Sequence, residues 1–173
     1  AKCGESARRA AADIWSSGQS RPNQCGPLFD QAQAGGVIDD AASWERQLLA
    51  FKANSHGRVR YLARKLEDTD YDTASDWLET RYRHPDKVDN LPTNIKPEQR
   101  QQLLAAAIHR WAYKDTVKAR QWFDDHSRRQ GLRDDAMRED AGRRIAWYST
   151  IRGIEENRQW LDKWLTVNPD AEL

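Results

Sequence analysis

Hydrophobic residues recur every three or four positions along most of the chain, which is the spacing that one face of an α-helix requires. Trp44, Leu48 and Phe51 form one such stripe. The pattern predicts helices at residues 7–15, 28–34, 40–54 and 58–66, from residue 73 onward, and at 97–113, 116–129, 133–150 and 154–165. Ala, Arg, Gln, Glu and Leu are abundant whereas Val and Ile are scarce, and this composition favours helices. We therefore expect an all-α protein.

Proline, glycine and capping residues mark the connections between these helices. Pro27 suits the first turn of a helix, and the two glycines at 35–36 stop that helix. Thr73 followed by Asp76 resembles a capping box with the shorter acid, so a helix is expected to open at Thr73. Residues 84–96 form the longest irregular segment, which is either a hinge or a surface loop.

A short motif repeats along the second half of the chain. Arg120-Gln-Trp-Phe-Asp124 recurs as Arg158-Gln-Trp-Leu-Asp162, residues 74–79 form a fainter copy, and the copies lie 38 to 45 residues apart. Helical repeats of this length stack side by side and bury their apolar faces against their neighbours. We expect one domain over residues 1–173, an α-solenoid of stacked antiparallel helical hairpins in the style of tetratricopeptide repeats. The eight tryptophans are expected to pack between hairpins, the alternative being a platform for a sugar ring.

Charge and hydropathy exclude two kinds of partner. The chain carries 28 Lys and Arg against 27 Asp and Glu, a net charge of +1, whereas sequence-independent nucleic-acid binding needs an excess of positive charge. No apolar run approaches the roughly 18 residues of a membrane-spanning helix. Arginines are concentrated between Arg110 and Arg158, with aromatic residues among them. This region is either a solvated helix face with i,i+4 ion pairs or a surface for an anionic or glycan ligand.

Neither a metal site nor a catalytic site can be derived from the residues. Carboxylates at 68, 70, 72, 76 and 79 match the spacing of an EF-hand loop, but Thr73 replaces the glycine of its sharp turn. Acidic residues at the start of a helix are also explained by the helix dipole. The four histidines show no zinc-ligand spacing, His109 being expected beside the core and the others exposed. We predict no metal and no cofactor.

The two cysteines, Cys3 and Cys25, flank the first predicted helix and the connection after it. Two cysteines are compatible with a disulfide in an oxidising compartment or with two reduced thiols. In the chain-entropy model such a disulfide would contribute roughly 3 kcal/mol. The residues themselves leave both alternatives open.

One stretch resembles a known family. It reads Trp15-x-x-Gly-x-Ser-x-Pro-x-x-Cys25-x-x-Leu-Phe29, followed by Gly36-x-Ile38 and Trp44-x-Arg46. Over residues 14 to 46 this motif resembles the superhelical region of soluble lytic murein transglycosylases. Beyond residue 46 only the regular succession of helical hairpins is similar. The family are bacterial periplasmic enzymes that cleave the bond between N-acetylmuramic acid and N-acetylglucosamine and form a 1,6-anhydro product. Their non-catalytic part is a long superhelix of α-hairpins beside a lysozyme-like catalytic domain.

The resemblance implies a right-handed superhelix that is a fragment of a larger chain, located in the periplasm. It favours the disulfide between Cys3 and Cys25, although the family places the partner of Cys25 further upstream. No motif of the catalytic domain is present in the sequence, so no glutamate inherits the catalytic role. The fragment is therefore expected to be a scaffold rather than an enzyme by itself, while its parent is a peptidoglycan lyase.

The implied partners are peptidoglycan, the parent's own catalytic domain and other cell-wall proteins. Arginines on an inner face are expected to meet peptide-stem carboxylates or glycan, and the candidates are Arg143, Arg144, Arg152 and Arg158. A rival interpretation is a free-standing helical-repeat adaptor that binds a protein along a concave surface. A third is a small calcium-responsive helical protein, which would show a calcium-dependent melting temperature.

Overall fold

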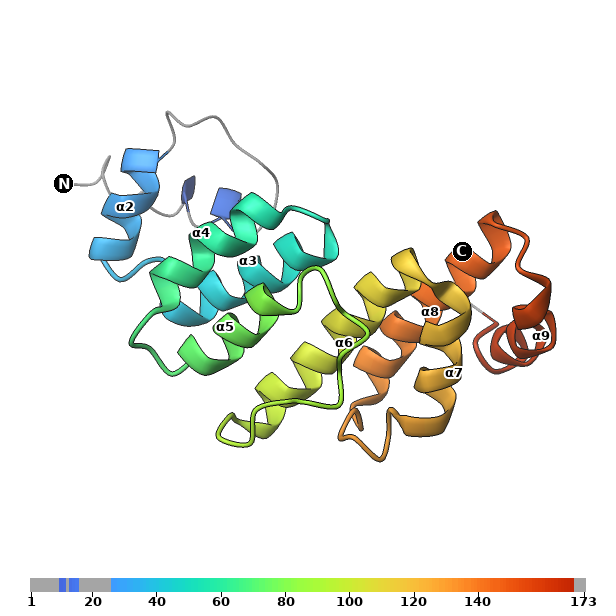
Figure 1. Cartoon of the computed structure of the whole chain (residues 1–173). Coiled ribbons are helices and arrows are strands. Elements are labelled where there is room, and N and C mark those ends of the chain that lie inside the picture. Colours follow the sequence, from blue (N-terminus) through green and yellow to red (C-terminus); the bar gives the residue numbers. More distant parts are fainter. Residues whose placement is uncertain (1–9, 12, 16–25, 170–173) are drawn as a thin grey trace. The chain divides into compact units, whose positions relative to one another are not determined.

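The computed structural model describes residues 10–11, 13–15 and 26–169, and these residues form helices and loops with no strand among them (Figure 1). The predicted all-α fold class is confirmed. The contacts divide the chain into two compact units, an N-terminal unit at Ala1–Glu79 and a C-terminal unit at Thr80–Leu173. Of the helices described, none is both long and apolar enough to cross a lipid bilayer.

Four helices of the N-terminal unit match the predicted ones to within a few residues. They are α2 (Gly26–Ala34), α3 (Asp40–Lys52), α4 (His56–Leu66) and α5 (Asp72–Thr80), and residues 13–15 are also helical. Helices α3 and α4 pack along each other, and Gln47 Nε2 of α3 donates to the Val59 carbonyl of α4 at 3.1 Å. Because only residues 53–55 join them, the two helices form an antiparallel hairpin.

The ends of these helices follow local rules in most places. The Asp39 carboxylate accepts a hydrogen bond from the Ala42 amide at 2.7 Å and caps α3, and Gly36 adopts a φ of 68° in the turn before it. The capping box at Thr73 is wrong. Helix α5 already begins at Asp72, because the Ser75 amide bonds to the Tyr71 carbonyl at 2.8 Å, so Thr73 lies inside the first turn.

Three residues of the family motif meet in the core of the N-terminal unit. Trp15 and Phe29 pack edge to face with their ring centroids 5.1 Å apart. The Arg46 guanidinium lies 4.4 Å from the Trp15 ring centroid and donates to the Trp15 carbonyl. All three side chains are buried. The motif that carries the resemblance is therefore a packing motif in this unit.

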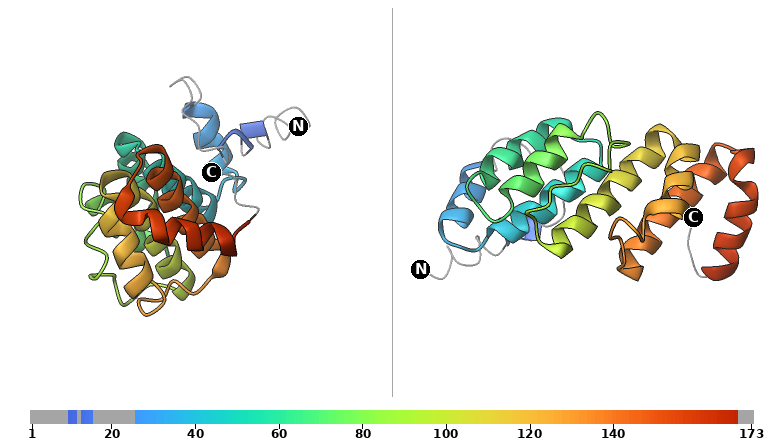
Figure 2. Two further views of the ribbon diagram at one scale, coloured as in Figure 1. Left: turned by 90° about the vertical axis from the view of Figure 1, so that its right-hand side faces the viewer. Right: turned by 60° about the horizontal axis from the view of Figure 1, so that its bottom comes forward.

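The C-terminal unit is built from longer helices. They are α6 (Pro97–Lys114), α7 (Thr116–His126), α8 (Asp135–Ile151), the 3₁₀-helix η2 (Glu155–Asn157) and α9 (Arg158–Val167). Helix α6 packs against both α7 and α8, and α9 packs against α8 (Figure 2). The predicted helix at 154–165 is present, with its first turn tightened into η2. Leu103, Leu104, Ile108 and Ile145 are fully buried between these helices.

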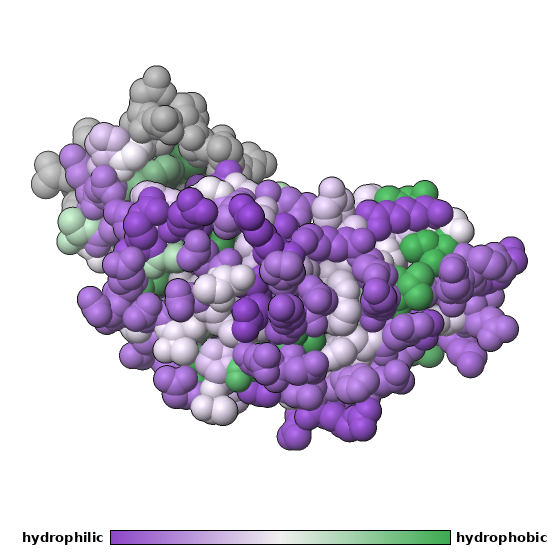
Figure 3. Space-filling model, viewed as in Figure 1, coloured by the Kyte–Doolittle hydropathy of each residue, from purple (hydrophilic) through white to green (hydrophobic). Residues whose placement is uncertain are grey.

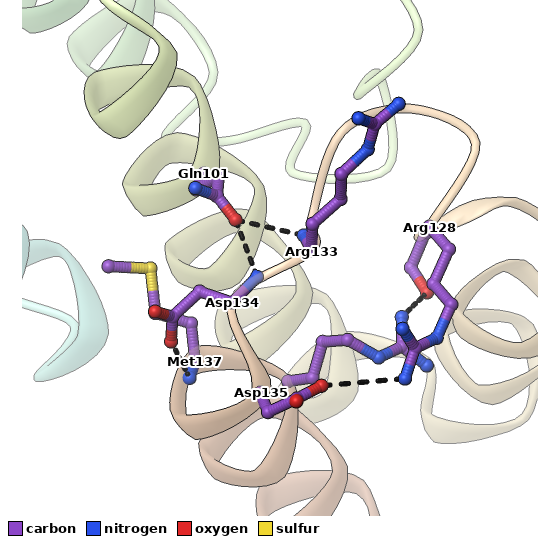
Figure 4. Close-up of polar contacts among 8 residues, drawn as sticks. Gln101, Arg128, Arg133, Asp134, Asp135 and Met137 are labelled. Atoms are coloured by element: carbon purple, nitrogen blue, oxygen red, sulfur yellow. Dashed lines mark hydrogen bonds and ion pairs between the residues drawn. The ribbon is translucent and has the colours of Figure 1, made fainter.

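A polar contact fixes the start of α8 on α6. Gln101 Oε1 accepts from the amides of Arg133 and Asp134, at 2.8 and 2.6 Å. The Asp134 carboxylate in turn caps α8 by accepting from the Met137 amide at 2.8 Å (Figure 4). One side chain of α6 thus satisfies two amides in the connection to α8.

The repeated motif has a shared structural use. Trp160 of the second copy donates its indole hydrogen to Asp124 of the first copy at 2.8 Å. Trp122 of the first copy donates to Asp89 at 3.4 Å. In each case the motif tryptophan bonds to a carboxylate earlier in the chain, so the repetition in sequence reflects repeated contacts.

The irregular segment at 84–96 is anchored within the C-terminal unit. Val88 and Leu91 are buried. Just before it, Arg110 Nε donates to the Tyr82 carbonyl at 2.6 Å, and the Arg110 guanidinium lies 3.6 Å from the Tyr82 ring centroid. Burial lowers the pKa of Arg110.

The surface between these contacts is mainly polar. Hydrophilic residues cover most of the face seen in Figure 3, and hydrophobic residues show there only in small patches. This distribution is expected of a chain in which 32% of the residues are charged, because the helices turn their apolar stripes toward one another.

Candidate functional site

The main candidate site is a pocket of about 210 Å³ between α6 and α8. Its lining residues are His109, Asp140, Arg143, Arg144 and Trp147. Four of them follow from the register of one helix, since positions 140, 143, 144 and 147 are three or four residues apart and share a face of α8. The fifth, His109, comes from the neighbouring α6, which is the helix that α8 packs against.

Arg144 holds a positive charge in this pocket against neutral partners. Its guanidinium lies 4.8 Å from the Trp147 ring centroid and 4.5 Å from the Tyr148 ring centroid, and one terminal nitrogen donates to the Tyr148 hydroxyl at 2.7 Å. Within the described ranges no carboxylate forms an ion pair with it, and its buried Nε has no hydrogen-bond partner. The aromatic rings hold the side chain in place and leave its charge uncompensated.

Arg152 lies on the same aromatic cluster, two turns further along α8. Its guanidinium is 4.3 Å from the Tyr148 ring centroid and 5.6 Å from that of Tyr113. Its hydrogen bond goes to the Thr116 hydroxyl at 3.2 Å. As with Arg144, its partners in the described part of the chain are neutral, so two unneutralised guanidinium groups share the Tyr148 ring.

The other two candidate arginines are paired with acids. Arg143 forms an ion pair with Asp140 at 3.5 Å, and each side chain is more than two-fifths exposed. Arg158 pairs with Glu155 at 2.8 Å on the exposed start of α9. The structure therefore places Arg143, Arg144 and Arg152 along the last turns of α8 and at its end, whereas Arg158 lies on α9 and does not line the pocket.

Sequence reasoning missed several residues of this site. The sequence places His109 beside the core, and in the structure it is half-buried and lines the pocket. Trp147 is half-buried too, unlike the buried tryptophans of the core, which are Trp15, Trp44, Trp77, Trp111 and Trp122. The i,i+3,i+4 spacing of Asp140, Arg143, Arg144 and Trp147 is the signal that could have grouped them.

A second, smaller hollow lies in the N-terminal unit between α4 and α5. It measures about 90 Å³, and its lining includes Arg60, Arg64, Asp72, Asp76 and Glu79. Arg60 pairs with Glu79 at 3.5 Å. Three of the carboxylates of the EF-hand spacing therefore line this hollow, but nowhere in the described ranges do three or more acidic, histidine or cysteine side chains form a group that could hold a metal ion.

The predicted pairing of Cys3 with Cys25 lies outside the described residues and stays a prediction. The side chains of the pocket between α6 and α8 are suited to binding a ligand. A planar guanidinium held against aromatic rings, with unused donors, suits a carboxylate or another oxyanion, and the exposed part of an indole suits an apolar or sugar face.

Comparison with known proteins gives consistent matches. The soluble lytic murein transglycosylase of Escherichia coli (strain K12) is 29% identical over 171 residues, which is 98% of this chain and 26% of the relative. That of Salmonella typhimurium (strain LT2) is 37% identical over 84 residues, covering 49% of this chain and 13% of the relative. No family model matches the chain.

Solved structures agree with the sequence matches. The crystal structure of the 70 kDa soluble lytic transglycosylase from Escherichia coli matches with a TM-score of 0.72 and 26% identity, over 94% of this chain and 26% of that one. A complex of the 70 kDa soluble lytic transglycosylase with bulgecin A matches with the same TM-score, over 93% of this chain. The chain thus spans about a quarter of the length of the Escherichia coli relatives. The resemblance inferred from the motif is confirmed, and this chain is homologous to a helical part of soluble lytic murein transglycosylase.

Proposed function

We propose that this chain is the non-catalytic helical scaffold of a peptidoglycan lytic transglycosylase. The observation that carries the proposal is the match to one quarter of such an enzyme over 98% of the chain, with a similar helical structure. The parent would cleave the murein glycan with formation of 1,6-anhydro products. The scaffold would position the catalytic domain and confine a murein strand.

Two features of the chain support a scaffold. Its conspicuous motif, which includes Trp15, Phe29 and Arg46, is used for internal packing. The two clearest copies of its repeat contact each other through the hydrogen bond from Trp160 to Asp124. The proposal includes the finer points of the prediction, namely one right-handed superhelical domain over residues 1–173 and a periplasmic location.

The test compares this chain with the protein encoded by its complete reading frame. Each is incubated with purified murein sacculi, and the soluble products are analysed by mass spectrometry for 1,6-anhydro muropeptides. We expect none from the 173-residue chain and release by the longer protein. Release by the chain alone would contradict a non-catalytic scaffold. A reading frame without a lysozyme-like segment would overturn the assignment and favour the adaptor.

A further inference from the structure

Arg144 in the pocket between α6 and α8, and Arg152 near it, form no ion pair with a carboxylate among the described residues. Several other arginines of this chain are neutralised locally, for example Arg120 by Asp124 at 3.6 Å and Arg128 by Asp135 at 3.5 Å. Arg144 and Arg152 instead donate to the hydroxyls of Tyr148 and Thr116. A hydroxyl is a neutral acceptor, so it leaves the positive charge in place for an anion.

The pocket also limits the size and shape of its ligand. Its volume of about 210 Å³ is below the roughly 300–1,000 Å³ of pockets that enclose a whole drug-sized molecule, so it suits one charged group and its nearest neighbours. Trp147 provides an apolar wall. Beside it, the partly exposed Asp140–Arg143 pair offers an acceptor and donors to a polar group such as an amide.

We propose that this pocket binds the free carboxylate end of a short peptide. The carboxylate accepts hydrogen bonds from the terminal nitrogens of Arg144, the aliphatic part of the last residue lies against Trp147, and the preceding amide faces Asp140 and Arg143. Arg152 adds positive charge on the same aromatic cluster. A neutral glycan would leave the charge of Arg144 uncompensated, which is why the geometry favours an acid.

This inference rests on the proposed function only for the source of the peptide, which would be the peptide stems of murein. The binding step itself depends on the pocket alone. The two proposals can therefore fail separately. If the chain binds the peptide but not murein, peptide binding by the pocket stands, and murein as the source of the peptide is refuted.

The experiment titrates the purified chain with N-acetyl-alanyl-alanine and, separately, with its C-terminal carboxamide. Binding is followed by the ¹H–¹⁵N NMR signals of the Trp147 indole and the Arg144 Nε–H, assigned with Trp147→Phe and Arg144→Lys. We expect the free acid to move both signals with a dissociation constant in the millimolar range, and the carboxamide to bind at least about tenfold more weakly. A hydrogen bond to a charged group contributes about 1.5–3 kcal/mol, which corresponds to roughly 10- to 100-fold in affinity.

Variants distinguish binding in the pocket from a general attraction between the positive charges of the protein and the anionic peptide. Arg144→Gln should lose about tenfold or more in affinity, whereas Arg158→Gln removes the same charge from α9 and should change it less than about twofold. Arg144→Lys keeps the charge without the bidentate fork, so an intermediate affinity is expected. Thermal melting followed by circular dichroism checks that each variant is folded. If Arg144→Gln does not fold, Arg144→Lys replaces it in the comparison.

Three results would overturn the proposal. The first is equal binding of the acid and the carboxamide. The second is unchanged affinity in a folded Arg144 variant. The third is movement of the Trp147 signal by a neutral N-acetylglucosamine oligomer but not by the dipeptide acid, which would make the pocket a glycan site instead.

Discussion

Asp124 is a side chain on which two opposing effects meet. Partial burial raises its pKa, while the hydrogen bond from Trp160 and the positive charge of Arg120 lower the pKa by a smaller amount. The net pKa is above the usual value of an aspartate. A raised pKa in the folded state means that the folded protein binds this proton more tightly than the unfolded chain does.

The stability of the protein should therefore carry a pH-dependent contribution from Asp124. This contribution is present below the pKa of the unfolded chain and is lost as the pH rises through the raised folded value. The unfolding free energy of the wild type, relative to Asp124→Asn, should increase as the pH falls from 7 toward 3. Urea denaturation of both proteins across that range measures it, and a difference that shrinks toward acidic pH would refute the assignment.

Single residues show what the sequence could predict and what it could not. It singled out Arg143, Arg144, Arg152 and Arg158 as ligand-facing, which stays a prediction; the structure places the first three along the second half of α8 and at its end, and Arg158 on α9. It could not show that Asp140 neutralises Arg143 whereas Arg144 contacts aromatic rings and a hydroxyl. That distinction depends on side-chain orientation, which helical spacing alone does not fix.

Helix α8 begins at a defined cap. The Asp134 carboxylate accepts from the Met137 amide at 2.8 Å, so Asp134→Ala should lower the unfolding free energy by about 1 kcal/mol, the usual cost of losing an N-cap. Asp134→Asn should keep most of the stability, because asparagine also caps helices well. Chemical denaturation at pH 7 measures both variants. Equal losses for the two would show that the charge rather than the cap matters.

The contact between α8 and α9 depends on a glycine. A Cβ placed on Gly142 would lie 2.6 Å from the Trp164 indole nitrogen, so α9 can approach α8 only because residue 142 has no side chain. In an open helix, replacing glycine by alanine stabilises by about 1 kcal/mol. At Gly142 the clash with Trp164 is expected to make the substitution destabilising, since overpacking typically costs about 1–3 kcal/mol.

Gly142→Ala should therefore lower the melting temperature, and the same substitution in a Trp164→Ala background should raise it. The comparison is a double-mutant cycle within one contact. Gly57→Ala is a further control, because a Cβ at residue 57 would meet no described atom within 4 Å. Stabilisation by Gly142→Ala in the wild-type background would contradict the close approach of α9.

The hydrophobic period predicted the helices well because most of them bury apolar residues at helical spacing, as α4 does with Val59, Leu62 and Leu66, although α9 has no buried residue. Hydrophobic spacing misplaced some helix boundaries, because hydrogen bonds of other residues determine where those helices begin. The start of α5 at Asp72 is one case, and the tightening of residues 155–157 into a 3₁₀ turn is another. The tryptophan repeat was detected in sequence, but its carboxylate partners Asp89 and Asp124 lie too far along the chain for local rules to find.

Two compact helical units make up the chain. The family motif lies in one of them and the candidate binding pocket in the other. The motif behind the family resemblance packs the core of the N-terminal unit. The proposed anion-binding pocket is in the C-terminal unit, beyond the part of the sequence where the motif is specific. Recognition of the family and recognition of the site therefore needed different information, the first from sequence and the second from side-chain geometry.

The central claim is the proposal that this chain is a scaffold that binds murein, and co-sedimentation with purified murein sacculi tests that binding most directly. The wild-type chain should sediment with the sacculi in a salt-sensitive manner. The Arg144→Gln/Arg152→Gln variant should remain largely in the supernatant, while Arg158→Gln should sediment like the wild type. No sedimentation of the folded wild-type chain would contradict the claim, whereas equal sedimentation of all three proteins would keep murein binding and refute the role of the pocket arginines.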